Sequence, residues 1–244
     1  MANQTAAISE IFSSLQGEGT HLGERHLFLR FETCNIHCDY CDELGKPGYD
    51  FDLNSTLESL KRLDLEFGPH AYVSLTGGEP LLYVSFLKIL LPELKKINLR
   101  AYLETNGILS KPLREVIDQV DVVAMDVKPA SVTQERSFLK EHEEFLKISL
   151  AKETFIKMVC SQEIDLDEFK ELCLMIKEVI QGQVHNAGDL SLNVPLILQP
   201  ISTDMEGHED PVLMNLLGEL QSVGLGILKD VRIIPRLHKI LKIR

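Results

Sequence analysis

The chain has 244 residues, of which 44% are hydrophobic and 25% are charged, with 15 glycines and 10 prolines. This composition is typical of a globular protein with a large core and excludes a disordered or fibrous chain. The net charge of −12 makes nucleic acid an unfavourable partner, because binding to phosphates depends on clustered Lys and Arg. Positive charge is concentrated in residues 229–244, which hold six Lys or Arg and one Asp.

Short β-branched or aromatic runs alternate with longer helical patterns along the chain. The predicted strands are residues 26–30, 72–76, 100–105, 120–126, 154–160, 191–199 and 230–234. The predicted helices between them are residues 55–67, 84–97, 111–119, 133–146, 165–181 and 211–223. Strands joined by single helices form right-handed crossovers in a parallel sheet. We therefore expect an α/β fold, a partial TIM-like (βα)6 barrel with a parallel sheet, formed by residues 1–244 as a single domain.

The apolar stretches fall well short of the ~20 residues that a membrane-spanning helix needs. The N-terminal residues lack the basic and apolar regions of a secretory signal. Five cysteines are an odd number, and three of them lie within eight residues, which does not suit a secreted disulfide framework. We therefore expect a cytoplasmic protein in a reducing compartment, with neither a membrane nor a nucleic acid as partner.

Three cysteines form a C-x3-C-x2-C motif directly after the first predicted parallel strand: Cys34, Cys38 and Cys41. Three thiolates in a short loop can hold a 4Fe-4S cluster and leave its fourth iron open to a small chelating ligand. A structural zinc site is an alternative, with His37 or His26 as the fourth ligand, and free thiols are another. The spacing favours a cluster.

Polar residues follow four of the predicted strands at their carboxyl ends. These segments are Gly77-Gly78-Glu79-Pro80, Glu104-Thr105-Asn106-Gly107, Asp126-Val127-Lys128-Pro129 and Gln199-Pro200. In barrels built from βα units, the loops at this end of the strands carry the chemistry. We therefore expect the functional site at this rim.

The remaining histidines and cysteines carry no pattern of their own. Six histidines show no metal-ligand spacing among themselves and are predicted to be solvated: His21, His26, His70, His142, His185 and His208. Cys160 and Cys173 lie in apolar surroundings on a predicted strand and a predicted helix. We expect both to be small buried hydrophobic residues.

The cysteine motif, with Tyr40 before its last cysteine, and the Gly77-Gly78-Glu79-Pro80 segment together resemble the signature of the radical S-adenosylmethionine (SAM) superfamily. The resemblance implies a full or partial (βα) barrel, a 4Fe-4S cluster on the three cysteines, and SAM chelating the open iron. It implies cofactor-binding roles for Tyr40, Gly77, Gly78, Glu79, Glu104, Asn106, Lys128 and Gln199. By themselves, the two glycines are also compatible with a tight turn, and Lys128 with a surface pair to Asp126.

Both ends of the chain resemble the 7-carboxy-7-deazaguanine synthase family, through residues 8–19 with Gln16-Gly17-Glu18-Gly19 and through residues 233–239. The resemblance implies a lyase that converts 6-carboxy-5,6,7,8-tetrahydropterin into 7-carboxy-7-deazaguanine with loss of ammonia, in queuosine and deazapurine biosynthesis. Catalysis would rest on the cofactor, and the two ends would be short substrate-binding extensions of a radical SAM core. The implied substrate-binding residues are Gln16, Gly17, Glu18, Arg30, Thr76 and His238.

Two positions depart from the pattern of that family. Glu43 stands where a threonine usually helps to bind Mg²⁺, and we retain Glu43 as a candidate magnesium ligand. Arg236 stands where glutamine is common and adds charge. A second cluster motif is absent from the sequence, so the resemblance implies a flavodoxin or ferredoxin as electron donor. It also implies a homodimer.

Two other functions fit part of the sequence. An activase of a glycyl radical enzyme would share the chain length, the cysteine spacing and the glycine-rich turn, but it has no evident need for residues 16–19 or 237–239. A zinc-stabilised binding protein without catalytic activity would need only the cysteines and one histidine. Colour separates this last function from the others, because a 4Fe-4S protein is brown and a zinc protein is colourless.

Overall fold

The structure is a computed structural model that describes residues 4–41, 45–187, 193–201 and 210–243. Within these residues the strands are β1 (Ala6–Leu15), β2 (Arg25–Phe31), β3 (Tyr49–Phe51), β4 (Tyr72–Gly77), β5 (Arg100–Thr105), β6 (Val122–Val127), β7 (Glu153–Cys160), β8 (Leu196–Pro200) and β9 (Val231–Ile233). The α-helices are α1 (Leu53–Phe67), α2 (Val84–Lys96), α3 (Ser110–Val116), α4 (Ala130–Thr133), α5 (Leu139–Ser149), α6 (Leu166–Ala187), α7 (Pro211–Leu225) and α8 (Leu237–Leu241). Short 3₁₀ helices are η1 (Gly19–His21), η2 (Pro80–Tyr83) and η3 (Ile117–Gln119).

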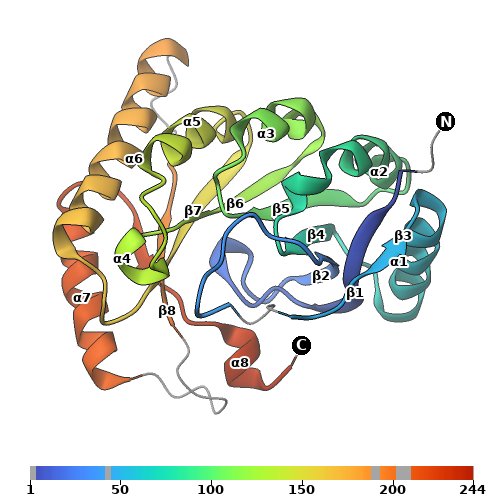
Figure 1. Cartoon of the computed structure of the whole chain (residues 1–244), viewed down its shortest axis with the longest axis horizontal. Coiled ribbons are helices and arrows are strands. Elements are labelled where there is room, and N and C mark those ends of the chain that lie inside the picture. The colour runs from blue at the N-terminus through green and yellow to red at the C-terminus, as the bar shows by residue number, and fades with distance from the viewer. Residues whose placement is uncertain (1–3, 42–44, 188–192, 202–209, 244) are drawn as a thin grey trace.

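The strands form one curved sheet in the order β3-β1-β2-β4-β5-β6-β7-β8-β9. Strands β2 and β4 to β9 are parallel, whereas β1 and β3 add an antiparallel edge. Helices α2, α3, α5, α6 and α7 lie on the outer side of the sheet (Figure 1). In the described part of the chain the edge strands β3 and β9 do not pair, so the barrel stays open. Six strand-helix units followed by β9 confirm the predicted partial (βα)6 barrel.

The antiparallel edge was not predicted from the sequence. Strand β1 contains Ser9, Glu10, Ser13 and Ser14, which obscure the alternation of apolar residues that marks a strand. Its register with β2, from Ile8 opposite Phe31 to Leu15 opposite Arg25, satisfies backbone groups that β2 would otherwise expose at the sheet edge. The extended conformation of β1 therefore depends on its pairing with β2 and not on its own local sequence.

The predicted boundaries differ most from the structure in three elements. The helix predicted for residues 133–146 is two helices, because Gln134 is left-handed with a φ of 58° and ends α4 before α5 begins. The carboxylate of Glu168 accepts hydrogen bonds from the first N–H groups of α4, which fixes its early start. Helix α6 runs on to Ala187, beyond residue 181. The strand predicted for residues 191–199 begins at Leu196, and residues 191–192 lie outside the described residues.

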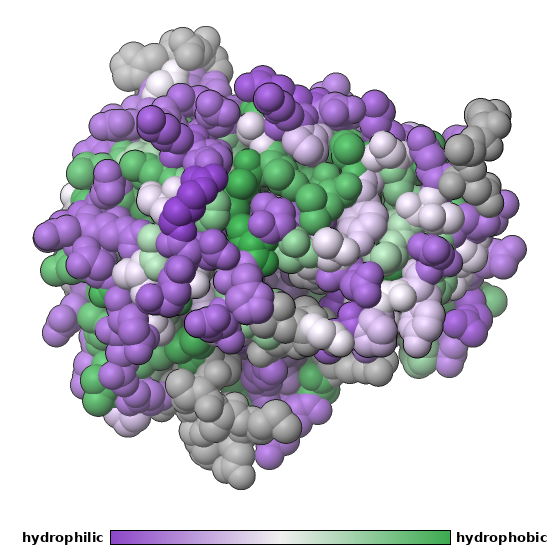
Figure 2. Space-filling model, in the orientation of Figure 1, coloured by the Kyte–Doolittle hydropathy of each residue, from purple (hydrophilic) through white to green (hydrophobic). Residues whose placement is uncertain are grey.

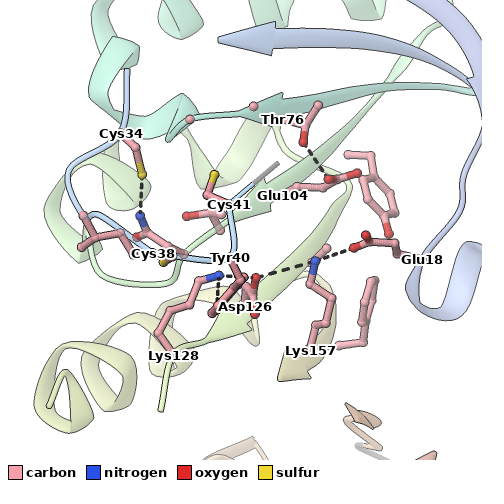
Figure 3. Close-up of a pocket in the computed structure, with 18 of the residues that line it drawn as sticks. Glu18, Cys34, Cys38, Tyr40, Cys41, Thr76, Glu104, Asp126, Lys128 and Lys157 are labelled. Atoms are coloured by element: carbon pink, nitrogen blue, oxygen red, sulfur yellow. Dashed lines mark hydrogen bonds and ion pairs between the residues drawn. The ribbon is translucent and has the colours of Figure 1, made fainter. Parts of the chain in front are cut away.

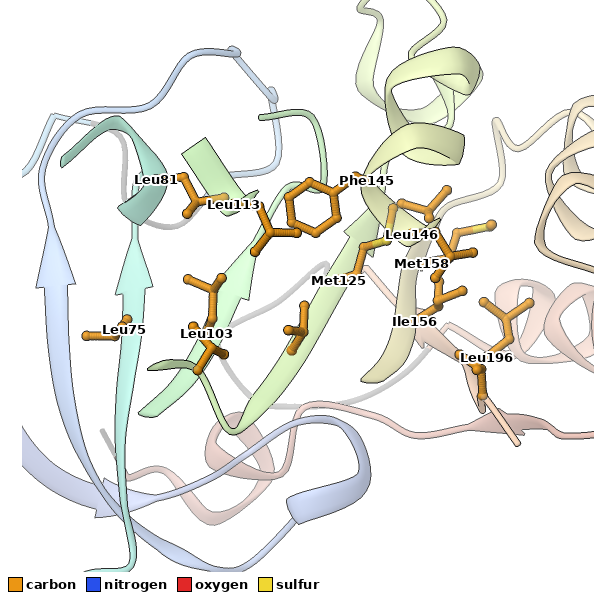
Figure 4. Packing of buried hydrophobic residues seen from close by; sticks show 14 of the residues in the cluster. Leu75, Leu81, Leu103, Leu113, Met125, Phe145, Leu146, Ile156, Met158 and Leu196 are labelled. Atoms are coloured by element: carbon orange, nitrogen blue, oxygen red, sulfur yellow. The ribbon is translucent and has the colours of Figure 1, made fainter. Parts of the chain in front are cut away.

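Successive residues of each parallel strand point to opposite faces of the sheet. The set facing the helices forms the main core (Figure 4). It includes Leu75, Leu103, Met125, Ile156 and Leu196 from the strands and Leu81, Leu113, Phe145 and Leu146 from the helices. Burying each such side chain stabilises the fold by about 1.5–3 kcal/mol. Cys160 and Cys173 are fully buried in this core, as predicted.

The other set of strand residues faces the concave side. At the amino ends of the strands this set is largely apolar and forms a second cluster: Tyr72, Tyr102, Val122, Ala124, Phe155 and Ile197. Towards the carboxyl ends the same alternation brings polar residues to the concave side: Thr76, Glu104, Asp126, Lys157 and Gln199. The period of two therefore directs polar groups from five neighbouring strands to one rim.

The surface of the molecule is mixed in character. Figure 2 shows hydrophilic residues around the edge of one face and hydrophobic residues gathered towards its centre. None of the described helices combines the length and the hydropathy that crossing a bilayer requires.

The prediction that the six histidines are solvated is wrong for four of them. The buried ones are His21, His26, His70 and His142. Each finds polar partners through the fold, as when the side chain of His70 binds Asp64 at 2.8 Å and Ser13 at 2.8 Å. His208 and the side chain of His185 lie outside the described residues. Partners contributed by distant elements are invisible to a search for local spacing.

We expect His142 to make stability depend on pH. Burial on α5 lowers the pKa of His142 from 6.5 to about 4. The unfolded chain therefore takes up a proton near pH 6.5 that the folded chain takes up only near pH 4, so stability is lost as the pH falls between these values. From pH 7 to pH 5 the free energy of unfolding should fall by roughly 2 kcal/mol through this group. Denaturant titrations of the cluster-free protein at both pH values measure the loss, and His142→Gln should reduce it.

Candidate active site

The cysteine loop and the glycine-rich turn are folded against each other. The N–H of Gly78 donates to the carbonyl of Phe31 at 2.8 Å, and the N–H of Glu79 donates to the carbonyl of Thr33 at 2.8 Å. Gly77 has a φ of +100°, and a Cβ at Gly78 would collide with the carbonyl of Thr33. Both positions therefore require glycine, because the end of β4 approaches the start of the cysteine loop so closely.

The three motif cysteines, Cys34, Cys38 and Cys41, line one cavity at the carboxyl ends of the strands (Figure 3). Within the described residues their sulfurs do not all lie within 4.8 Å of one another, whereas ligands of one tetrahedral zinc ion lie about 3.8 Å apart. His26 is no candidate for a fourth ligand, since it lies near the start of β2 and the cysteines follow the end of that strand. The side chain of His37 is 69% exposed. The donor set therefore fits a cluster of several irons better than a single zinc ion.

Burial raises the pKa of the thiols of Cys34 and Cys38 above the ordinary value. Each thiol becomes a good ligand when a positively charged centre favours its thiolate. Asn106, which follows β5, extends its Nδ2 to within 3.8 Å of the Sγ of Cys34. The three cysteines differ in exposure, with Cys34 exposed, Cys41 half-buried and Cys38 buried, and all three are free thiols that line a common cavity.

Glu79 lies beneath the cavity and does not line it. Its side chain is fully buried and accepts hydrogen bonds from the N–H groups of Leu81 and Asn106 and from the hydroxyl of Thr105. Burial raises its pKa to about 7. The structure therefore places this predicted cofactor residue as the link between the turns that follow β4 and β5.

Most of the other predicted cofactor residues surround the cavity of the cysteines. Lys128, which follows β6, donates to Asp126 Oδ2 at 2.7 Å and to the hydroxyl of Tyr40 at 3.3 Å (Figure 3). The pair with Asp126 therefore exists, but in the cavity wall and not on the surface. The predicted cluster-binding and cofactor-binding residues that line this cavity are Cys34, Cys38, Tyr40, Cys41, Gly77, Gly78, Glu104, Asn106 and Lys128.

A second cavity adjoins the first. Among its lining residues are all six predicted substrate-binding residues, Gln16, Gly17, Glu18, Arg30, Thr76 and His238. The two cavities share Gln16, Glu18, Tyr40, Cys41, Thr76, Glu104, Asp126 and Lys157. A ligand in one cavity would therefore lie beside a ligand in the other, and Tyr40 and Cys41 are among the residues that could contact both.

The second cavity is built by both ends of the chain. The N–H of Leu237 donates to the carbonyl of Gly17 at 2.9 Å, and a Cβ at Gly17 would collide with the ring of His238. Next to this contact, Gln16 Nε2 donates to Glu104 Oε1 at 2.9 Å, and the hydroxyl of Thr76 donates to Glu104 Oε2 at 2.7 Å. These contacts bring residues that are more than 200 positions apart to one wall.

Lys157 on β7 is a site residue that the sequence analysis missed. Its Nζ lies 2.5 Å from Glu18 Oε2 and 3.6 Å from Asp126 Oδ2 (Figure 3). Burial disfavours its charge, but Glu18 and Asp126 hold the pKa of Lys157 above the ordinary value. Burial likewise opposes ionisation of Glu18, yet Lys157 together with Arg236 lowers the pKa of Glu18 to about 2. The sequence offered one signal for this role, because Lys157 is a charged residue within the otherwise largely apolar predicted strand of residues 154–160.

Buried polar atoms in these walls have no hydrogen-bond partner among the described residues. They include Asp126 Oδ1, in the wall shared by both cavities, and Gln199 Oε1, in the second cavity. Leaving such an atom unsatisfied costs about 1–3 kcal/mol, so both atoms point to polar ligands. Gln199, predicted on the cofactor side, lies in the cavity of the substrate-binding residues.

Arg30 and Arg236 place two guanidinium groups in the wall of the second cavity. Arg30 donates to Glu10 Oε2 at 2.6 Å and lies 5.1 Å above the ring of Phe12. Arg236 is buried directly before α8. Glu43 lies outside the described residues.

Comparison with known proteins agrees with this geometry. Residues 29–180 match the sequence model of the Radical SAM superfamily. A 7-carboxy-7-deazaguanine synthase of Geobacter sulfurreducens is 34% identical, over 98% of this chain and 98% of the relative. Another, of Methanocaldococcus jannaschii, is 29% identical over 96% of this chain and 98% of the relative. The crystal structure of QueE from Escherichia coli has the same fold, with a TM-score of 0.59 at 18% identity, covering 96% of this chain and 95% of that one.

Proposed function

We propose how the site works in this chain, which belongs to the 7-carboxy-7-deazaguanine synthase family of the radical SAM superfamily. Its reaction is that of a carbon-nitrogen lyase, the ring contraction of 6-carboxy-5,6,7,8-tetrahydropterin to 7-carboxy-7-deazaguanine with loss of ammonia. The observation that carries the proposal is the junction of two cavities. One is lined by the cysteine motif, and the other by the motifs from both ends of the chain.

The first cavity is the proposed cofactor site. Cys34, Cys38 and Cys41 would hold a 4Fe-4S cluster, and SAM would lie beside it in the same cavity. When bound, these groups supply the radical that abstracts hydrogen from the substrate. The protein contributes position and charge. The ammonium group of Lys128 in the cavity wall can pair with the carboxylate of the methionine moiety.

The second cavity is the proposed substrate site, formed by short extensions at the two ends of the radical SAM core. A carboxylated pterin presents hydrogen-bond donors along one edge and a carboxylate. Glu18, ionised because its pKa is held at about 2, accepts from the donors. Arg30 provides a positive charge for the carboxylate, and the imidazole of His238 provides a hydrogen-bond donor. The positive charge of Lys157, which lies between Glu18 and Asp126, offsets part of the negative charge of these two carboxylates. The wall can therefore accept an anionic ligand.

The single test is an anaerobic assay with the carboxytetrahydropterin, SAM and a strong reductant. We expect the reconstituted protein to form 7-carboxy-7-deazaguanine. Arg30→Ala and His238→Ala should each lower substrate capture by roughly tenfold to a hundredfold, because each removes a charge-assisted contact of about 1.5–3 kcal/mol. Both variants should still cleave SAM slowly, since neither residue lines the cofactor cavity. Cleavage of SAM by the unmutated protein without deazaguanine product would overturn the substrate and leave the radical chemistry standing.

Magnesium is a further proposed ligand, and Glu43, directly after Cys41-Asp42, is its proposed partner. A carboxylate is a hard oxygen ligand, as Mg²⁺ prefers. We expect Glu43→Ala to need more added Mg²⁺ than the unmutated protein for half-maximal product formation. The concentration that Glu43→Thr needs should lie between those of Glu43→Ala and the unmutated protein. An unchanged magnesium dependence in both variants would remove Glu43 from the site.

We propose a flavodoxin or ferredoxin as electron donor, a homodimer as the assembly and the cytoplasm as the location. The five cysteines are all unpaired, which suits a reducing compartment. Sedimentation equilibrium at the mass of one chain would contradict the dimer. A failure of both reduced proteins to support SAM cleavage, where dithionite succeeds, would contradict the donor.

The two alternative functions are less favoured. An activase does not account for a second cavity that both chain ends line, nor for relatives of the same length named 7-carboxy-7-deazaguanine synthase. A zinc-stabilised binding protein does not account for the spread of the three sulfurs or for the match to the radical SAM model.

A further inference from the structure

Two histidines and a glutamate meet at the amino ends of the strands, the end opposite the cysteine loop. His21 ends η1, and His26 begins the concave face of β2 opposite Tyr72. Glu24, between them in sequence, places its Oε2 3.0 Å from His21 Nδ1 and 3.6 Å from His26 Nε2. One ligand atom from each of the three residues lies within 4.8 Å of the other two.

The other nitrogen of each imidazole ring is held from outside this group. His21 Nε2 bonds Glu153 Oε1 at 2.9 Å, and His26 Nδ1 bonds Ser74 Oγ at 2.8 Å. Metal-bound histidines commonly use their second nitrogen in this way, which fixes both tautomer and ring orientation. These contacts leave His21 Nδ1 and His26 Nε2 facing Glu24.

His26 Nε2 is the unexplained atom of the group. The side chain of His26 is fully buried, and its Nε2 has no hydrogen-bond partner among the described residues. A buried polar atom without a hydrogen-bond partner calls for a ligand or a water molecule.

The spacing of the three atoms suits a small cation. Ligands bonded to a tetrahedral zinc ion at 2.0–2.1 Å lie about 3.3 Å apart. The distances from Glu24 Oε2 to the two imidazole nitrogens are 3.0 Å and 3.6 Å, and the two nitrogens lie within 4.8 Å of each other. We propose that His21 Nδ1, Glu24 Oε2 and His26 Nε2 bind a divalent transition-metal ion of the zinc type. Two imidazoles and one carboxylate are a common ligand set for such ions. The side chain of Glu24 is 49% exposed and gives the ion an entry path from solvent.

The ion would have a structural role, because it would join η1 to β2. Helix η1 covers the apolar cluster of the concave side, where the ring of His21 packs edge-on at 5.2 Å from Tyr72 and 5.4 Å from Tyr102. Glu18 of the second cavity directly precedes η1. A metal joining His21 to β2 would therefore fix the segment that carries Gln16 and Glu18, from the side away from the reaction.

The test measures zinc on cluster-loaded protein, in which the cysteine sulfurs are already occupied. Equilibrium dialysis against buffered Zn²⁺ should give one zinc per chain in addition to the cluster iron. X-ray absorption at the zinc edge should show nitrogen and oxygen neighbours without sulfur. Glu24→Gln should weaken zinc binding at least thirtyfold and abolish the rise in melting temperature that zinc produces in the unmutated protein. His26→Gln should do the same.

Glu66→Gln is the matched control, because it removes an exposed carboxylate on α1 outside the three-residue group. It should bind zinc as the unmutated protein does. Glu24→Gln carries the decision if His26→Gln fails to fold, since Glu24 is half exposed and its amide has the same shape. Sulfur in the zinc shell, equal zinc affinity in Glu24→Gln and the unmutated protein, or no zinc retained at micromolar free Zn²⁺ would each overturn the proposal.

Discussion

Replacing Cys38 with alanine is expected to abolish both cluster assembly and product formation. Cys34→Ala and Cys41→Ala should do the same, because the three sulfurs are the whole thiolate donor set at the first cavity. Iron and acid-labile sulfide per chain, together with the brown absorbance after anaerobic reconstitution, measure the loss. We expect less than a tenth of the iron bound by the unmutated protein.

Cys160→Ala and Cys173→Ala are the matched controls. Both thiols are fully buried in the core behind the sheet and away from the cavity walls. Burial raises the pKa of Cys173 to about 12 and that of Cys160 still further, so neither is a ready iron ligand. These variants should keep their iron and lose about 1 kcal/mol of stability to the small cavity created. Near-normal iron in the Cys38 variant would refute the assignment of the motif.

Removing the charge of Lys157 is expected to have the second largest effect. Lys157→Met keeps the length of the side chain but leaves the buried carboxylate of Glu18 without its nearest counter-ion. Breaking a buried ion pair from one side costs about 3–5 kcal/mol, so product formation per active cluster should fall at least a hundredfold. The pKa of Glu18 should rise from about 2, since the cation that lowers it is gone.

A double-mutant cycle separates this effect from general damage. Glu18→Gln combined with Lys157→Met removes both charges, and the double variant should lose less than the two single losses added together. Lys170→Met, which removes an exposed lysine paired with Asp167 on α6, should leave product formation unchanged. Simple additivity of the Glu18 and Lys157 effects on substrate binding, measured by anaerobic titration, would show that the pair is not coupled.

The sequence alone was sufficient for the parallel part of the fold and for the cofactor motif. The parallel strands, β2 and β4 to β9, are largely apolar because their outer faces pack on helices and much of their inner faces is also enclosed, so every parallel strand could be predicted. The cysteine spacing and the glycine-rich turn are local in sequence and could be read directly. The motifs at the two ends could be read as well, but not the contact of Gly17 with His238 that joins them.

Tertiary structure decided what depends on distant partners. Strand β1 exists because β2 offers an edge to pair with, and the helix predicted for residues 133–146 breaks where Gln134 turns left-handed. Lys157 becomes part of the site only when β7 aligns it opposite Asp126. His21 and His26 are buried beside Glu24 because η1 packs against the apolar cluster of the concave side, although the four residues between them in sequence did not predict this burial. Burial and charge pairing between remote segments depend on the folded chain, so the local periodicity of apolar and polar residues cannot predict them.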